Sequence, residues 1–266
     1  MKFIDYRIKD TNFKRLVIRF LKAGVMEDGI IKETEKGTPQ GGIISPILAN
    51  IYLHFVYDLW FKATQKKSNP ENNTVRYADD CCATFQYEWA AKKFVEQLKE
   101  RMNKFGLELQ EEKTKIIEFG RYAARNRKAR GEGKPETFDF LGFTHYCSIS
   151  RKNGKFRAKR KTSRKKLKSK TAAMKKWIKE NMHKPVKELT EQLNVKLIGH
   201  YNYYGITDNL PSIRKFRHVT IKMLYKAINK RSQKNRYSWA EFYEKMVKDK
   251  IVIPTVKKDI LALHKI

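Results

Sequence analysis

The sequence is poor in cysteine and contains no long hydrophobic run. Its three cysteines, Cys81, Cys82 and Cys147, are odd in number and form no Cys-x-x-Cys pair, which argues against a disulfide framework and against a zinc site. No apolar stretch approaches the roughly 18 residues that a membrane span needs. The first residues, MKFIDYRIKD, lack the apolar segment of a secretory signal. We therefore expect a reducing, cytoplasmic compartment and no membrane partner.

Acidic residues are scarce relative to basic ones. The 266 residues include 59 Lys and Arg against 28 Asp and Glu, a formal net charge of +31. Such an excess is expected of a protein that binds a polyphosphate, because each neutralised phosphate releases counterions. Residues 1–120 hold 20 basic and 17 acidic residues, whereas residues 121–170 hold 18 and 3. This division is typical of a catalytic or structural module joined to a nucleic-acid-binding one, although charge alone also fits an ordinary basic protein.

Apolar spacing predicts the secondary structure of the first half. The first 26 residues contain an amphipathic helix capped by Thr11 or Asn12. A second helix is expected from about Ser45, in SPILANIYLHFVYDLWFKAT, and its wide apolar surface predicts burial. Residues 75–87 are predicted to form a β-hairpin and residues 88–105 an amphipathic helix.

The middle and the end of the chain show weaker patterns. GLELQEEKTKIIEFG, residues 106–120, alternates as two short strands would, and the polar residues 121–136 are expected to be a mobile basic loop. TFDFLGFTHYCSIS has the composition of a strand, and a hairpin turn is predicted at Asn153-Gly154. From about Ser163 onward the pattern is helical, with breaks at Pro185, around GITDNLPS and at Pro254.

Two adjacent carboxylates, Asp79 and Asp80, lie within VRYADDCC between two predicted strands. Neighbouring side chains on a strand point to opposite faces, so this pair could share a site only at a hairpin tip. A bound Mg²⁺ would relieve their repulsion, because hard cations prefer oxygen ligands. A two-metal site for phosphoryl transfer usually takes more carboxylates than these. The alternative is an ordinary solvated turn.

Several motifs together resemble the reverse transcriptases encoded by group II introns. They are YADD at residues 77–80, preceded by GTPQGGIISPILANIYL and followed by LELQEEKTKII and FLGF, all in the order of that family. Farther on, LIGHYNYYG and KRSQKNRYSW resemble the maturase-specific region that forms the polymerase thumb. Cys81 and Cys82 depart from the large residues common after the motif, and we expect them to have a packing role.

The resemblance implies roles for particular residues. Asp79 would ligate catalytic Mg²⁺ with Asp80 beside it. The residues implied to lie near the incoming deoxynucleotide are Gln40, Gly41, Gly42 and Lys113, and those implied to support the primer terminus are Phe140, Leu141, Gly142 and Phe143. Structural alternatives are a tight loop for the glycines, a solvent-facing lysine, and an ordinary core strand for FLGF.

The family pattern includes a further carboxylate on an earlier palm strand. Before Asp79 the sequence offers only Asp5, Asp10, Asp28 and Asp58, none of which fits the pattern. We therefore expect an N-terminally truncated reverse transcriptase that lacks the fingers and the first carboxylate strand. Its two-metal Mg²⁺ site would be incomplete and its polymerase activity as a separate chain impaired.

Basic residues dominate the start of the second half. The predicted nucleic-acid-binding residues are Arg151, Lys152, Arg157, Lys159, Arg160, Lys161, Arg164, Lys165 and Lys166. Tyr201, Tyr203 and Tyr204 are candidates for stacking on RNA bases, with the core of the thumb as the favoured alternative. The histidines, His200 among them, form no metal-ligand spacing with the cysteines and are interpreted as packing or RNA-contacting residues.

These observations predict an α+β fold, with a partial reverse-transcriptase palm over residues 1–150 and a helical, basic thumb or maturase domain over residues 151–266. The predicted function is RNA-directed DNA polymerase and intron maturase, with group II intron RNA, an RNA template, a DNA primer and deoxynucleotides as partners. The alternative is a non-catalytic RNA-binding splicing factor in which the palm is a scaffold. The sequence leaves the oligomeric state open.

Overall fold

Antiparallel hairpins and helices alternate along the chain, which confirms the α+β class. The computed structural model describes residues 1–22, 25–27, 30–32, 44–67, 71–150, 153–231 and 236–258. They pack as two units, Met1–Ile116 and Ile117–Ile266. Each unit contains its own cluster of buried apolar side chains, so each is described by itself.

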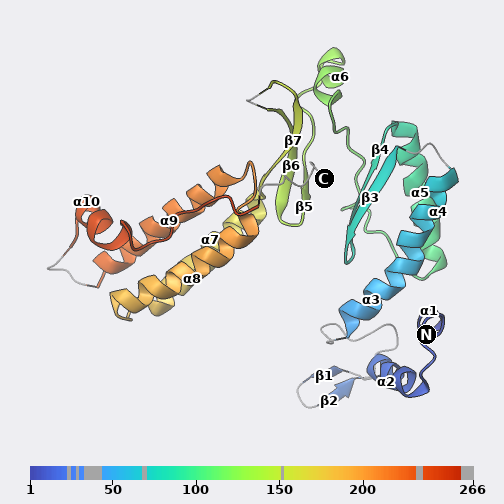
Figure 1. Cartoon of the computed structure of the whole chain (residues 1–266), viewed down its shortest axis with the longest axis horizontal. Coiled ribbons are helices and arrows are strands. Elements are labelled where there is room, and N and C mark those ends of the chain that lie inside the picture. The colour runs from blue at the N-terminus through green and yellow to red at the C-terminus, as the bar shows by residue number, and fades with distance from the viewer. Residues whose placement is uncertain are drawn as a thin grey trace. The chain divides into compact units, whose positions relative to one another are not determined.

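The N-terminal unit combines helices with two antiparallel hairpins (Figure 1). Its helices are α1 (Lys2–Asp5), α2 (Thr11–Lys22), α3 (Ser45–Leu53), the π-helical η1 (His54–Asp58), α4 (Leu59–Lys67) and α5 (Glu88–Lys104). Its strands are β1 (Val25–Glu27), β2 (Ile30–Lys32), β3 (Asn72–Tyr77) and β4 (Asp80–Phe85).

Helix α2 forms where the apolar spacing predicts a helix, but its cap differs. Oδ1 of Asp10 accepts a hydrogen bond from the backbone N–H of Phe13 at 2.8 Å. An acidic side chain at this position satisfies a free N–H group and complements the positive end of the helix dipole. Asp10 therefore caps α2, whereas the prediction placed the cap at Thr11 or Asn12, one or two residues later.

Helices α3, η1 and α4 follow one another without interruption and begin at Ser45 as predicted. The predicted burial is wrong for the first part, because no side chain of α3 is buried, whereas Val56 and Tyr57 of η1 are 0% and 1% exposed. An apolar surface needs a partner to become buried, and the main separate element packed on α3 is the four-residue α1. In η1 the carbonyl oxygen of Val56 accepts a hydrogen bond from Nε of Arg101 at 3.0 Å. This π-helical segment therefore has a hydrogen-bond partner from another helix, α5.

The β3–β4 hairpin confirms the strand prediction for residues 75–87. Its register runs from Asn72 opposite Phe85 to Tyr77 opposite Asp80. Helix α5 packs on β4, as the amphipathic pattern of residues 88–105 predicts. The main cluster of buried apolar side chains in this unit consists of Val56, Tyr57, Phe61, Phe94, Leu98 and Met102.

The C-terminal unit combines a three-stranded antiparallel sheet, in the order β5-β6-β7, with a group of helices. Its strands are β5 (Phe138–Phe140), β6 (Phe143–Ile149) and β7 (Phe156–Thr162). Its helices are α6 (Ala123–Ala129), α7 (Arg164–Asn181), α8 (Val186–Tyr204), α9 (Leu210–Asn229), α10 (Trp239–Phe242) and the π-helical η2 (Tyr243–Val247).

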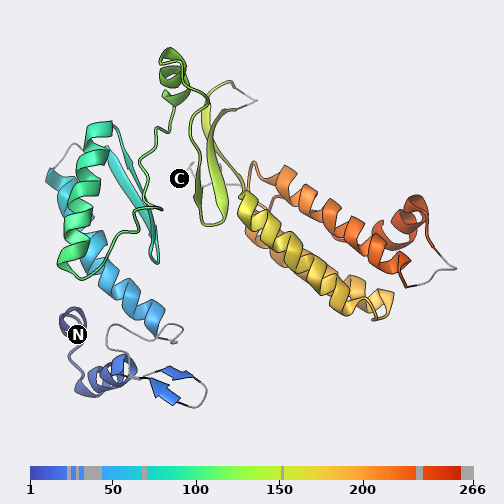
Figure 2. The ribbon, with the colours of Figure 1, turned by 180° about the vertical axis from the view of Figure 1, so that it is seen from behind.

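Local signals account for several boundaries in this unit. The predicted Asn153-Gly154 turn lies between β6 and β7, and Gly154 has φ +64°. Ser163 caps α7, its side chain accepting from the backbone N–H of Lys166 at 3.4 Å. The predicted break at Pro185 separates α7 from α8. Helices α7, α8 and α9 run alongside one another in both views (Figures 1 and 2), and their facing sides carry the core.

Two predictions for the middle of the chain are wrong. Residues 107–110 and 114–119 form no strand, because an alternating sequence becomes a strand only when a neighbour completes its hydrogen-bond ladder. Residues 121–136, predicted to be a mobile loop, contain α6. Its stabilising contacts come from residues outside the helix, which its own composition does not reveal.

The packing boundary at Ile116 and Ile117 differs from the predicted domain boundary at residue 150. The predicted boundary follows the family motifs, the last of which in the predicted palm is FLGF at residues 140–143, rather than packing, so the palm and thumb assignment stays a prediction. Among the described helices, none is long and apolar enough to cross a membrane.

Candidate functional site

The sequence YADD forms the tip of the β3–β4 hairpin. Tyr77 pairs with Asp80 at the end of the ladder, so Ala78 and Asp79 are the two turn residues. Ala78 has φ +53°, the sign that a type II′ hairpin turn requires at its first central position. Asp79 and Asp80 are both exposed. The two adjacent carboxylates therefore lie at a backbone reversal, where neighbouring side chains can share a site.

The hairpin has one exposed face and one face toward the helices. Residues opposite each other in an antiparallel ladder share a face, so Asp80 lies on the same face as Tyr77 and Val75. Tyr77 and Val75 are 65% and 60% exposed. The opposite face carries Thr74 and Arg76, which contact the continuous helix made of α3, η1 and α4, here called the long helix. The exposed face is thus available to a ligand that reaches the tip.

Arg76 fastens the turn to the long helix. Its Nε and Nη2 donate to the two carboxylate oxygens of Asp58 at 2.8 and 2.7 Å. Its Nη1 donates to Oδ1 of Asn50 at 2.9 Å and to the carbonyl oxygen of Ala78 at 2.8 Å. The guanidinium of Arg76 holds the pKa of Asp58 below its ordinary value. One side chain therefore connects α3, η1 and the residue before Asp79.

Tyr57 provides a second anchor for the hairpin. Its hydroxyl lies 2.6 Å from Oγ1 of Thr74 on β3, and the Tyr57 ring is buried. Burial raises the pKa of the Tyr57 phenol, which remains protonated at neutral pH. Sequence reasoning missed both anchors. For the Arg76 anchor a signal was available: Asp58 is a charged residue in an apolar helix, and Arg76 is a charged residue on a strand. A half-buried charge needs a partner, so the two residues could have been expected to pair.

The carboxylates of Asp79 and Asp80 suit a hard cation. Both are exposed, and among the described residues neither forms an ion pair. Mg²⁺ is commonly held by one or two carboxylates, with water and substrate phosphates completing the octahedron. The described part of the chain contains no group of three or more His, Cys, Asp or Glu residues that could hold a metal.

The other acidic residues considered as metal ligands have different partners. Asp58 is paired with Arg76, and Asp10 caps α2. Oδ1 of Asp5 lies 3.3 Å from Nζ of Lys14. Asp28 lies outside the described residues.

The sequence FLGF forms a tight turn rather than a continuous strand. Phe140 pairs with Phe143, and Leu141 and Gly142 between them have φ +49° and +79°. Positive φ at both positions is the signature of a type I′ turn. The hydroxyl of Tyr203, on α8, donates to the carbonyl oxygen of Leu141 at 2.9 Å. Helix α8 thereby supports the turn implied to lie near the primer.

The tyrosines of LIGHYNYYG pack mainly inside the C-terminal unit. Tyr201 and Tyr204 are 2% and 5% exposed, whereas Tyr203 is 54% exposed. A Cβ atom on Gly142 would lie 3.1 Å from the hydroxyl of Tyr204, so the turn approaches α8 closely. Phe143 stacks on Tyr203 with ring centroids 5.9 Å apart. These contacts favour the core alternative for Tyr201 and Tyr204.

The residues implied to bind the nucleotide are only partly described. Gln40, Gly41 and Gly42 lie outside the described residues. Lys113 is exposed in a turn, where its backbone N–H donates to the carbonyl oxygen of Gln110 at 3.0 Å. Its side chain is accessible to an anionic ligand.

The predicted nucleic-acid-binding residues differ in their surroundings. Arg151 and Lys152 lie outside the described residues. Arg157 is engaged within the unit, since its Nη2 lies 2.7 Å from Oδ2 of Asp208. The strand period places Lys159 and Lys161 on the face of Arg157.

The other predicted nucleic-acid-binding residues lie on the second face of β7 or in the first turn of α7. Arg160 lies on the other face of β7, opposite His145. Arg164, Lys165 and Lys166 are exposed in the first turn of α7. Cations are unfavourable at a helix N-terminus because of the helix dipole, so their concentration there points to an anionic partner.

A helix-backed hairpin that ends in two exposed carboxylates, in a chain with a large basic excess, is the arrangement expected of a metal-dependent enzyme that acts on nucleic acids. The family described as "Reverse transcriptase (RNA-dependent DNA polymerase)" matches residues 1–145. The chain belongs to the reverse transcriptase family. That family acts on RNA and DNA and generally uses divalent metal ions.

Similar curated proteins include members linked to introns. The chain is 34% identical over 131 residues to "Group II intron-encoded protein LtrA" of Lactococcus lactis subsp. cremoris, covering 45% of this chain and 22% of LtrA. It is 34% identical over 106 residues to "Protein YkfC" of Escherichia coli, covering 30% of this chain and 28% of YkfC. It is 52% identical over 51 residues to the "Uncharacterized 91 kDa protein in cob intron" of Schizosaccharomyces pombe, covering 19% and 6%. The matched segment spans less than a third of each relative.

Proposed function

We propose that the chain is a group II intron-type reverse transcriptase with RNA-directed DNA polymerase and maturase function, and that its polymerase activity is impaired because its carboxylate set is incomplete. The observation that carries the proposal is the exposed pair Asp79 and Asp80 at the tip of a hairpin whose turn Arg76 fastens to the long helix. Membership of the reverse transcriptase family and similarity to LtrA support it.

In this proposal Asp79 and Asp80 hold Mg²⁺. The metal, when bound, would stabilise the negative charge that develops as phosphoryl transfer proceeds. Arg76 fixes the turn, and thereby the direction from which the two carboxylates face the ligand. The two carboxylates would form part of a two-metal site, and the family pattern calls for a further one.

The remaining roles concern substrates. Gln40, Gly41, Gly42 and Lys113 are proposed to contact the deoxynucleotide, and the turn of residues 140–143 to support the primer. The cations of β7 and the exposed cations of the first turn of α7 are proposed to contact the phosphates of intron RNA and of the template and primer duplex. Their concentration in a segment with few acids supports this assignment.

Substitution of the carboxylates tests the polymerase proposal. Asp79→Asn removes a charge that a metal needs. Incorporation of deoxynucleotide on an RNA template with Mg²⁺ is expected to be low in the separate chain, because its two-metal site is incomplete, and Asp79→Asn should reduce it further, by roughly two orders of magnitude or more. Glu96→Gln is the matched control, because Glu96 is an exposed carboxylate on α5 of the same unit. Incorporation that survives Asp79→Asn would contradict the proposed role of the pair.

A second function is favoured by one observation. The described residues contain no third carboxylate grouped with Asp79 and Asp80, while the basic surface needs no metal. A non-catalytic RNA-binding splicing factor would have these properties. Two assays of the parent chain and of Asp79→Asn separate the two functions: splicing of a group II intron RNA and incorporation of deoxynucleotide. If the chain is a splicing factor, both proteins should assist splicing and neither should incorporate deoxynucleotide. If it is a polymerase, the parent chain should incorporate deoxynucleotide and Asp79→Asn should lose this activity.

A further inference from the structure

The short helix α6 has two chemically different sides. At about 100° per residue, Ala123, Asn126, Arg127 and Arg130 fall on one side of the helix. Ala123 on this side is 3% exposed. Arg121, Arg125 and Lys128 fall on the opposite side, and all three are exposed.

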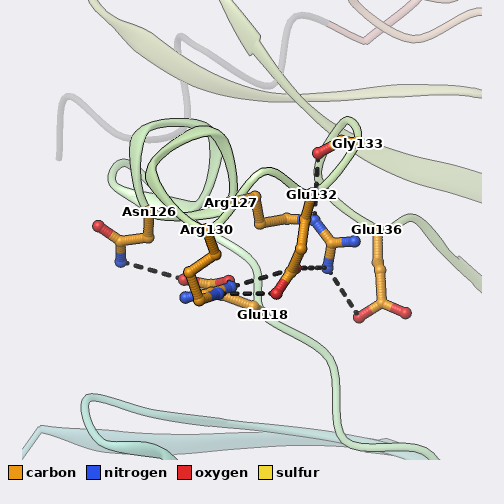
Figure 3. Close-up of polar contacts among 7 residues, drawn as sticks. All are labelled: Glu118, Asn126, Arg127, Arg130, Glu132, Gly133 and Glu136. Carbon is orange, nitrogen blue, oxygen red and sulfur yellow. Dashed lines mark hydrogen bonds and ion pairs between the residues drawn. The ribbon is translucent and has the colours of Figure 1, made fainter.

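The first side gathers every acidic residue of segment 117–137 (Figure 3). Nε of Arg130 donates to Glu132 at 2.7 Å, and its Nη2 donates to Glu118 at 2.5 Å. Nη1 of Arg127 lies 3.3 Å from Glu132 and 3.9 Å from Glu136. Hydrogen bonds from Arg130 lower the pKa of Glu118 and Glu132, which keeps both ionised.

Two further contacts close this network. Asn126 Nδ2 donates to Oε1 of Glu118 at 3.0 Å, and Nε of Arg127 donates to the carbonyl oxygen of Gly133 at 3.3 Å. Both ends of the segment are thus attached to the same side of α6. The carboxylates are used internally, so they do not neutralise or repel a ligand on the opposite side.

The opposite side presents free cations and one aromatic ring. Among the described residues, no carboxylate pairs with Arg121, Arg125 or Lys128. Tyr122 is 56% exposed, and Cζ of Arg125 lies 5.0 Å from the centroid of its ring. Arg125 and Tyr122 therefore form a preorganised cation and ring pair at the surface.

We propose that Arg121, Tyr122, Arg125 and Lys128 form an RNA-binding face, termed the α6 basic face, which contacts single-stranded RNA. Guanidinium groups bind phosphates in two-pronged geometry, and an exposed ring stacks on a base without sequence preference. The face offers no apolar patch beyond the ring, which disfavours a protein partner. This inference rests on the proposed function in taking RNA as the polyanion, and it adds a surface outside the cations of residues 151–166.

Fluorescence anisotropy with a short labelled oligouridylate tests the α6 basic face. The triple variant Arg121→Gln, Arg125→Gln, Lys128→Gln loses three phosphate contacts. The slope of log K against log salt concentration should therefore fall by about 2 in magnitude, at about 0.7 per contact on a single strand. Tyr122→Leu should weaken binding at least about 5-fold and leave the slope unchanged, because stacking involves no counterion.

The matched control removes the same charge from the N-terminal unit. Lys62→Gln, Lys93→Gln and Lys104→Gln together replace three exposed lysines of α4 and α5. An equal loss of slope in this control would show a general charge effect and overturn the proposal. So would displacement of the RNA by polyglutamate of equal charge as effectively as by unlabelled oligouridylate.

Circular dichroism checks that the variants remain folded. We expect them to, because none of the substituted side chains forms an ion pair among the described residues. Unchanged RNA binding by a folded triple variant would also overturn the inference. That result would leave the polymerase proposal standing, because it is tested separately by Asp79→Asn.

Discussion

At the scale of single residues, half-buried and buried polar groups decide how the hairpin and the helical core are held. Arg76 lies on a strand and Asp58 on a helix, and the two residues are 18 positions apart in the sequence. Their side chains are 13% and 26% exposed, so water screens the pair only in part. The pair is therefore expected to contribute more to stability than an exposed ion pair does.

A double-mutant cycle measures this contribution. We expect Arg76→Gln and Asp58→Asn to show a coupling free energy of about 1–2 kcal/mol in urea unfolding, below the 3–5 kcal/mol lost on breaking a fully buried pair. The control pair is Lys92 and Glu88, exposed at i and i+4 on α5, for which no measurable coupling is expected. Equal coupling in both cycles would contradict an anchoring role for Arg76.

His200 predicts a pH dependence of stability. His200 is 9% exposed, and its ring stacks on that of Phe216 with the ring centroids 3.9 Å apart. Among the described residues, Nε2 of His200 has no hydrogen-bond partner. Burial lowers the pKa of His200 from 6.5 to about 4. Between pH 6.5 and about pH 4, His200 therefore carries a proton in the unfolded chain but not in the folded chain. The contribution of His200 to the free energy of unfolding is full above pH 6.5 and falls as the pH drops below this value.

The expected loss from His200 is about 2 kcal/mol between pH 7 and pH 5. His200→Phe keeps a stacking ring and removes the titration, so its free energy of unfolding should change less over this interval. Urea unfolding of both proteins at each pH gives the difference. Parallel pH profiles would show that His200 titrates normally in the folded protein.

At the scale of elements, prediction succeeded where the signal was local. The Ser45 helix start, α5, the β3–β4 hairpin and the Asn153-Gly154 turn each follow from residues within the element. The tip position of Asp79 and Asp80 followed in the same way. By contrast, the strands predicted in residues 106–120 lack ladder partners, and α6 is held partly by Glu118, which lies 12 positions from Arg130. The Arg76 anchor also depends on a pairing through space, which one sequence does not display.

Two glycines, Gly199 inside α8 and Gly205 at its C-cap, allow a matched test of packing. At Gly205, a Cβ would lie 2.3 Å from the carbonyl oxygen of Tyr201 and 2.8 Å from that of Thr255. Gly205→Ala therefore forces the backbone apart and should cost about 3 kcal/mol or more. At Gly199, inside the helix, nothing lies within 4 Å of an added Cβ.

Gly199→Ala should accordingly stabilise the protein by up to about 1 kcal/mol, since alanine favours the helix. Thermal unfolding of the two variants gives opposite shifts if the close approach at Gly205 is correct. A Gly205→Ala variant as stable as the parent chain would show that the segment near Thr255 does not pack there.

At the scale of the whole molecule, charge and packing divide the chain at nearly the same place. The unit Met1–Ile116 holds 20 basic and 16 acidic residues, whereas Ile117–Ile266 holds 39 and 12. The exposed carboxylate pair belongs to the first unit and the predicted RNA-binding cations to the second. Each unit has its own buried cluster. A polyanion should therefore stabilise the two units unequally.

Calorimetry with and without a short single-stranded RNA tests this asymmetry. Binding to the folded C-terminal unit stabilises it by about 2.7 kcal/mol when RNA is present at about 100 times its dissociation constant. For a unit of this size, that corresponds to a rise in Tm of roughly 5–10 °C. The transition of the N-terminal unit should move much less, because its basic excess is small.

Gly205→Ala identifies which transition belongs to the C-terminal unit, since it lowers the stability of that unit alone. High salt should abolish the RNA-induced shift, because the counterions released on binding then return to a concentrated solution. Equal shifts of both transitions, or a shift that persists in high salt, would contradict a division between a carboxylate-bearing unit and an electrostatic RNA-binding unit. An unequal, salt-sensitive shift would place the electrostatic contribution to RNA binding after Ile116.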